Sequence, residues 1–94
     1  MHAVSVQVNV DSSQEELARK LLREVTVPRA KALAGFRSGA WLRALEGGRG
    51  MSVLLFDSEE AARAARNEIR SAGPPEGSPV TMESVDVFEV VAEA

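Results

Sequence analysis

Residues 4–10 alternate strictly between apolar and polar side chains. Side chains two residues apart lie on the same face of a strand, and β-branched residues favour strands. The alternation therefore predicts a strand over residues 3–10. One face of this strand carries the valines, and the other carries the polar side chains Ser5, Gln7 and Asn9.

The next segment carries the spacing of a helix. Leucines and a valine recur three and four residues apart after Ser12 and Ser13, each of which stands three residues before a glutamate. This capping-box spacing predicts a helix over residues 13–26. Pro28 lacks an amide hydrogen and disfavours helical geometry at the residue before it, so we expect a break or kink there. One or two further turns then lead to Gly35, a residue type that commonly ends helices.

A second helix is predicted after residues 57–60, because the sequence Asp-Ser-Glu-Glu suits a helix N-terminus. Its alanine-rich face can lie close on a sheet, and it should end near Ser71. Three further strands are predicted over residues 36–45, 51–56 and 80–91. A glycine-rich turn joins the first two of these as a hairpin, and the loop AGPPEGSP precedes the last.

The element order is therefore β-α-β-β-α-β, which predicts a ferredoxin-like α+β sandwich. In that architecture the antiparallel sheet has the order 4-1-3-2, and both helices cover one face. The length of 94 residues suits one domain, so we assign residues 1–94 to a single unit.

Composition narrows the range of partners. The formal net charge is −3, so the chain lacks the excess of cations that nucleic acids and anionic membranes attract. No stretch approaches the roughly 18 apolar residues of a membrane span, and the N-terminus lacks a signal-peptide pattern. Cysteine is absent and the single histidine is His2, so we expect no metal site. These observations predict a cytoplasmic protein that binds neither nucleic acid nor membrane.

The face of the sheet opposite the helices is predicted to be too apolar to face water. Met51, Val53 and Leu55 point to one side of their strand, and Leu54 and Phe56 point to the other. The last strand is also apolar on both sides, with Val85, Val87 and Val91 on one face and Phe88 and Val90 on the other. The chain has nothing else to cover this second face. A second copy of the chain is therefore the predicted partner, and we expect a homodimer through the open sheet face.

Three segments carry a family resemblance: Gly35-Phe36 at the start of a strand, the run LLFDSEEA at residues 54–61, and the closing VDVFEVV at residues 85–91. They resemble the dimeric α/β-barrel superfamily, and within it the antibiotic-biosynthesis-monooxygenase-like branch. The resemblance covers nearly the whole chain in element order. It implies sheet-to-sheet pairing and a pocket between the sheet and the helices or within the barrel.

The same resemblance implies a range of activities. Members oxygenate quinol-like aromatics without a cofactor, degrade haem, isomerise substrates or act on chlorite. In the oxygenases the strand before the second helix often ends in Trp-x-Ser, whereas this chain has Phe56-Asp57-Ser58. Haem-degrading members place an iron-ligating histidine in that helix, and residues 58–71 contain none. We therefore expect no cofactor, and Phe56 is either a pocket residue or part of the core.

Two groups of residues are candidates for a ligand pocket. Gln7 and Asn9 lie on the polar face of a central strand, where they either bind an oxygenated ligand or satisfy each other and water. Trp41 is the only tryptophan, and the period of a strand places Arg37 and Arg43 on its face. This trio either stacks a planar anionic or phenolic ligand, or packs in the core or dimer interface while the arginines reach solvent.

Two functions stay open. The first is a small-molecule-binding dimeric barrel that acts as a cofactor-independent monooxygenase on an aromatic, quinol-like substrate. Gln7, Asn9 and an arginine would then orient the substrate and stabilise developing negative charge. The alternative is a non-catalytic homodimeric structural or regulatory module with a packed interior. A ligand-sized cavity would favour the first, and no residue stands out as catalytic.

Overall fold

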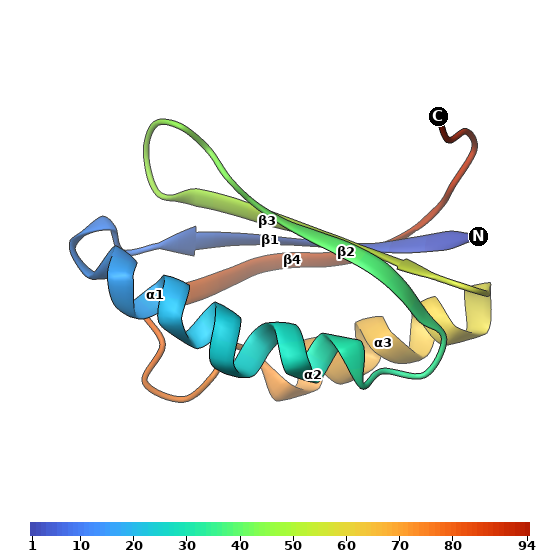
Figure 1. The fold of residues 1–94 in the computed structure, drawn as a ribbon, viewed down its shortest axis with the longest axis horizontal. Coiled ribbons are helices and arrows are strands. Elements are labelled where there is room, and N and C mark those ends of the chain that lie inside the picture. Colours follow the sequence, from blue (N-terminus) through green and yellow to red (C-terminus); the bar gives the residue numbers. More distant parts are fainter.

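Four antiparallel strands form one sheet in the computed structural model, which describes residues 1–94. Their order is β2-β3-β1-β4, which confirms the predicted order, and the helices lie together on one face (Figure 1). The ferredoxin-like α+β fold is therefore confirmed. The strands are β1 (His2–Val10), β2 (Phe36–Arg43), β3 (Arg49–Phe56) and β4 (Val80–Glu89).

The first helical layer, residues 12–31, is continuous, so of the break or kink predicted at Pro28 no break is present. A π-helical stretch stands directly before the proline, and in it the amide of Val27 donates to the carbonyl of Leu22, five residues earlier. Pro28 then falls in the first turn of a new α-helical segment, where a missing N–H is tolerated. The segments are a 3-10 turn (Ser12–Gln14), α1 (Glu15–Leu21), the π stretch (Leu22–Thr26) and α2 (Val27–Lys31).

The helix starts are capped by side chains. Ser58 Oγ accepts a hydrogen bond of 3.1 Å from the amide of Ala61 at the start of α3 (Glu59–Ala72). At the first layer the cap is Asp11 rather than the predicted serines. Its Oδ1 accepts from the hydroxyl of Ser13 at 2.7 Å and from the amide of Ser13 at 3.0 Å. These two hydrogen bonds hold the pKa of the Asp11 carboxyl below its usual value.

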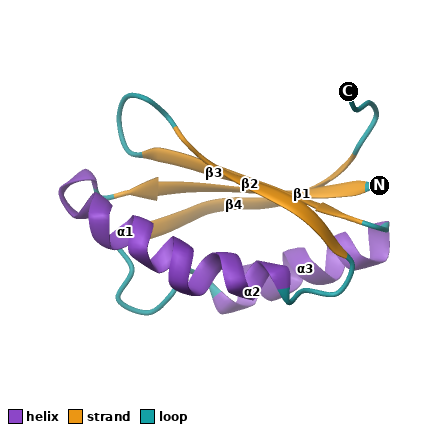
Figure 2. Cartoon of the chain, viewed as in Figure 1, coloured by secondary structure: helices purple, strands orange, loops and turns teal.

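The core lies mainly between the sheet and α3. Phe56 and Val4 are fully buried, and the ring of Phe36 meets the edge of the Phe56 ring with centroids 5.9 Å apart. Ala62 and Ala65 allow α3 to lie close to the sheet, whereas α1 buries no residue at all. The α1 end of the first layer therefore packs less closely than α3, and Figure 2 shows all the helices on one side of the sheet.

The opposite face of the sheet is uncovered in the single chain. The register places Met51, Val53 and Leu55 on it, beside polar side chains of β1. Leu42 and Phe88 also lie on this face and expose 52% and 54% of their surface. The face is thus apolar over β2 and β3 and polar along the middle of β1. None of the helices combines the length and apolar character needed to cross a membrane.

Candidate functional site

A cavity of about 390 Å³ lies between the helix-facing side of the sheet and the first helical layer. Its volume falls within the range of small-molecule pockets. The sheet contributes the valines of β1 together with Trp41, Leu54 and Met82, and most of the wall is hydrophobic. The cavity exists because α1 makes no close packing with the sheet. The helical side of the wall is formed chiefly by Ala18, Leu21, Leu22, Thr26, Arg29, Ala30 and Leu33.

Trp41 has a defined place in this wall. The residue pairs with Ser52 of β3, which is buried on the helix-facing side of the sheet. Its indole leans over Gly39, because a Cβ there would lie 3.2 Å from both Cζ3 and Cη2 of the ring. The same Cβ would lie 2.8 Å from Cδ2 of Leu54. The absence of a side chain at Gly39 therefore allows the indole to lie along the strand.

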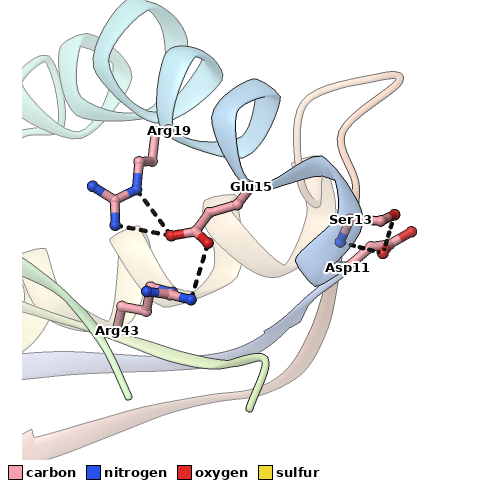
Figure 3. A network of polar contacts seen from close by, with 5 residues as sticks. All are labelled: Asp11, Ser13, Glu15, Arg19 and Arg43. Atoms are coloured by element: carbon pink, nitrogen blue, oxygen red, sulfur yellow. Dashed lines mark hydrogen bonds and ion pairs between the residues drawn. The ribbon is translucent and has the colours of Figure 1, made fainter. Parts of the chain in front are cut away.

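A charged network links α1 to β2 beside the cavity (Figure 3). Glu15 Oε1 accepts hydrogen bonds from Arg19 Nη2 at 2.9 Å and Arg19 Nε at 3.2 Å. Glu15 Oε2 lies 3.0 Å from Nη2 of Arg43, and all three residues line the cavity. No other side-chain hydrogen bond or ion pair joins α1 or α2 to the sheet. Glu15 and Arg43 therefore supply the polar link between the two walls.

The structure places the predicted pocket residues in several different parts of the molecule. Trp41 and Arg43 line the cavity. Gln7 and Asn9 lie on the opposite face of the sheet, where Gln7 is exposed and pairs with Met51 of β3. Phe56 is fully buried in the core and does not line the cavity.

Arg37 does not line the cavity, although Trp41 and Arg43 do. The pairing of β2 with β3 shifts between Phe36 and Ser38, so one extra residue interrupts the alternation at this point. The guanidinium of Arg37 is exposed, and its Nη1 donates to Oδ1 of Asp57 at 2.8 Å. Of the two arginines predicted to flank Trp41, only Arg43 lines the cavity.

Sequence reasoning missed the other charged residues of the wall, which are Glu15, Arg19, Arg29 and Glu68. Two signals were available. Arg19 stands four residues after Glu15, the spacing of an ion pair along one helix. Arg29 stands in phase with residues 22, 26 and 33, so it shares the helix face that carries the apolar stripe. No group of three or more His, Cys, Asp or Glu residues is placed to hold a metal ion.

Solved structures with the same fold include a haem degrader, a monooxygenase and a dimeric ferredoxin-like protein. MhuD, a haem degrader from Mycobacterium tuberculosis with two haems in its active site, is 26% identical, with 98% of both chains covered and a TM-score of 0.69. A point mutant of MhuD with two manganese protoporphyrin IX groups per active site, at 23% identity, gives a TM-score of 0.77 over 100% of this chain and 98% of that one.

The ActVA-Orf6 monooxygenase of Streptomyces coelicolor, in complex with nanaomycin D, is 15% identical. The match covers 99% of this chain and 89% of that chain with a TM-score of 0.62. A dimeric ferredoxin-like protein from an uncultured marine organism is 20% identical, with 100% and 98% covered and a TM-score of 0.72. No protein-family model and no curated protein matches the chain. The comparisons confirm the predicted resemblance at the level of the fold, which this chain shares with haem-bound MhuD and with structures described as monooxygenases.

Proposed function

We propose that this chain is a small-molecule-binding protein whose cavity takes a planar aromatic ligand. The observation that carries the proposal is the cavity of about 390 Å³ with Trp41 in an otherwise largely aliphatic wall. Aromatic ligands gain binding affinity from stacking or edge contacts with an indole as well as from the apolar area that they bury. The alternative of a module with a packed interior is disfavoured, because such a module has no space of this size.

The reaction that we propose is oxygenation of a quinol-like or anthrone-like substrate without a cofactor. O₂ takes up four electrons in such a reaction: one oxygen atom becomes a carbonyl of the product and the other leaves as water. The deprotonated aromatic supplies all four electrons when an activated methylene becomes a ketone. The apolar wall would keep water from the reactive anion, and Arg43 would stabilise its negative charge.

Haem is the ligand of MhuD, but the residues of this cavity do not fit it. Haem iron is held by histidine, cysteine or tyrosine, or by methionine together with histidine. The cavity wall contains none of the first three residue types. The only histidine, His2, lies outside the wall, and its Nε2 is 3.8 Å from Oε1 of Glu59. Met82 has no histidine beside it to complete the pair, and the side chain of Met51 lies on the open face of the sheet.

We also propose that the protein is a homodimer through the open sheet face. Leu42, Met51 and Phe88 expose 52%, 37% and 54% of their surface there, which favours burial against a partner. A second copy presents the same patch, so a two-fold arrangement covers both at once. Gln7 and Asn9 would then face the interior between the two sheets, where their amides pair with the partner or with ordered water.

Two measurements test the proposed function. O₂ consumption is followed for the purified protein with a panel of quinols and anthrones, and the emission of Trp41 is followed in the same titrations. We expect consumption faster than the buffer control and saturable quenching of the indole. Saturable quenching without O₂ consumption would remove the oxygenase assignment and keep the binding site. Absence of both effects would overturn the proposal that this cavity binds aromatic molecules.

A further inference from the structure

We propose that the aromatic ligand carries an acidic group that pairs with Arg43, and that Glu15 occupies the place of this group in the free protein. This inference rests on the proposed function, since it concerns the same cavity. It defines the class of ligand more narrowly, as a planar aromatic acid, and it assigns Glu15 the role of an internal competitor.

The charge of the wall differs in sign from the charge of the chain. Three arginines and two glutamates line the cavity, whereas the whole chain has a net charge of −3. A positive wall within an acidic protein attracts an anion to this point specifically, because field lines concentrate in an apolar cleft. The charged residues of the wall are Glu15, Arg19, Arg29, Arg43 and Glu68.

The ion pairs within the cavity wall leave positive charge available to bind a ligand. The guanidinium of Arg29 has no hydrogen-bond or ion-pair partner, and Arg43 has Glu15 as its only partner. Glu15 uses separate oxygens for its two contacts, Oε1 for Arg19 and Oε2 for Arg43. The contact with Arg19 is a local pair within α1 and does not depend on the sheet. A ligand carboxylate can therefore take Arg43 while Glu15 keeps Arg19.

Replacing the Glu15 carboxylate by a ligand carboxylate at Arg43 costs little free energy. The side chains of Glu15 and Arg43 expose 28% and 45% of their surface, and ion pairs at this level of exposure contribute little to stability. α1 has no buried residue that would be pulled from a core when the link opens. An incoming acid would restore the charge balance of Arg43, so the guanidinium of Arg43 is not left unpaired beside the apolar wall.

The spacing of the two sheet residues suits an aromatic acid. Trp41 and Arg43 lie two residues apart on the same face of β2, and both line the cavity. Residues at this spacing in a strand are roughly 6–7 Å apart. One aromatic ring with a directly attached carboxylate spans this separation, with the ring against the indole and the acid toward the guanidinium.

The experiment compares 2-naphthoate with 2-naphthamide, which have the same shape and differ in charge. Binding to the full chain is measured by isothermal titration calorimetry at low salt. We expect naphthoate to bind at least about tenfold more tightly than the amide. Glu15→Gln should tighten naphthoate several-fold and leave naphthamide unchanged, because it removes the competing carboxylate. Arg43→Gln should abolish the preference for the acid, and Arg43→Lys should keep part of it.

Two variants serve as matched controls. Glu16→Gln removes the same charge from α1, and Arg49→Gln removes the same charge from β3, at positions outside the cavity wall. Both should bind the two probes as the unmodified protein does. Equal affinity for the two probes would overturn the inference and leave the aromatic site intact. Weaker naphthoate binding in Glu15→Gln would also overturn it, whereas failure of both probes to bind would overturn the proposed site itself.

Discussion

Gly35 lies so close to Ala61 that a Cβ on the glycine would stand 2.6 Å from the Cβ of the alanine. Gly35 lies between α2 and β2, and Ala61 lies in the first turn of α3. This contact therefore joins the segment after α2 to α3 at one end of the sheet. The carbonyl of Gly35 also accepts a hydrogen bond of 2.9 Å from the amide of Asp57. The φ angle of Gly35 is +76°, a region that favours glycine.

This contact predicts that Gly35→Ala destabilises the protein through two separate effects. Gly47 provides the matched control, because its φ is +78° but no atom lies within 4 Å of a Cβ placed there. Gly47→Ala should cost about 1–2 kcal/mol from backbone strain alone. Gly35→Ala should cost a further ~1–3 kcal/mol, because α3 and the segment after α2 must move apart to make room for the methyl group. Urea unfolding measures both, and equal costs would contradict the close contact.

The packing of Trp41 over Gly39 predicts that Gly39→Ala changes the cavity. The new methyl group would meet Leu54 and the indole at once, so the ring must turn away from the strand. We expect a shift in the emission of the only tryptophan and a loss of about 1–3 kcal/mol in the free energy of unfolding. Aromatic ligands should bind more weakly to this variant. Unchanged emission together with unchanged binding would show that the indole does not rest on Gly39.

The caps predict different effects for two serines. Ser58→Ala removes the acceptor of the Ala61 amide and should cost about 0.5–2 kcal/mol, whereas Ser58→Thr should cost much less. Ser12→Ala should have little effect, since Asp11 caps the first layer. Thermal unfolding followed by circular dichroism compares the three variants. A large loss in Ser12→Ala would restore the capping box that the sequence pattern indicated.

The hydrogen bonds to Asp11 predict a pH dependence. Because its pKa is lower in the folded chain than in the unfolded chain, the carboxylate stabilises the fold above the unfolded value of about 4. This contribution is lost as the pH falls through the folded pKa. Asp11→Asn should therefore be less stable than the unmodified protein at pH 7, and the difference should shrink toward pH 3.

Urea midpoints at several pH values measure this effect, and Ser13→Ala is the companion variant because it removes the hydroxyl donor. It should weaken the pH dependence without changing the charge. Glu59 contributes in the same direction, since the hydrogen bond and the charge of Arg63 lower its pKa. A difference between Asp11→Asn and the unmodified protein that stays constant from pH 7 to pH 3 would contradict the assignment to the Asp11 carboxylate.

The exposed apolar patch predicts that Phe88→Glu weakens the proposed dimer. Phe88 lies on the open face opposite Ala3 of β1, where a charge would be buried by a partner. Sedimentation equilibrium should show a lower association constant for this variant. Leu17→Glu is the control, because Leu17 is 38% exposed on the helical side and a glutamate suits a helix. A monomeric unmodified protein at micromolar concentration would overturn the proposed homodimer.

The order of elements and the faces of the strands could be read from the sequence. Alternation along β1 and β3 sets which side chains share a face, and the register confirms that Met51, Val53 and Leu55 lie together. Periodicity is a local property, so short segments reveal it without knowledge of the rest of the fold. The same pattern did not indicate that Arg37 lies outside the cavity wall, because the extra residue in the pairing of β2 with β3 cannot be read from the alternation.

The position of the site depends on how far the helices lie from the sheet, and a local sequence pattern does not show this distance. Glu15 and Arg43 are far apart in the sequence and meet only because α1 lies opposite β2. The cavity arises because α3 presents alanines to the sheet and packs closely, whereas α1 buries nothing and stands away. Propensity and periodicity act over a few residues, while a cavity depends on how separate elements share one core. The sequence by itself therefore determined the sandwich and its topology, and the tertiary structure decided where a cavity remains between the helices and the sheet.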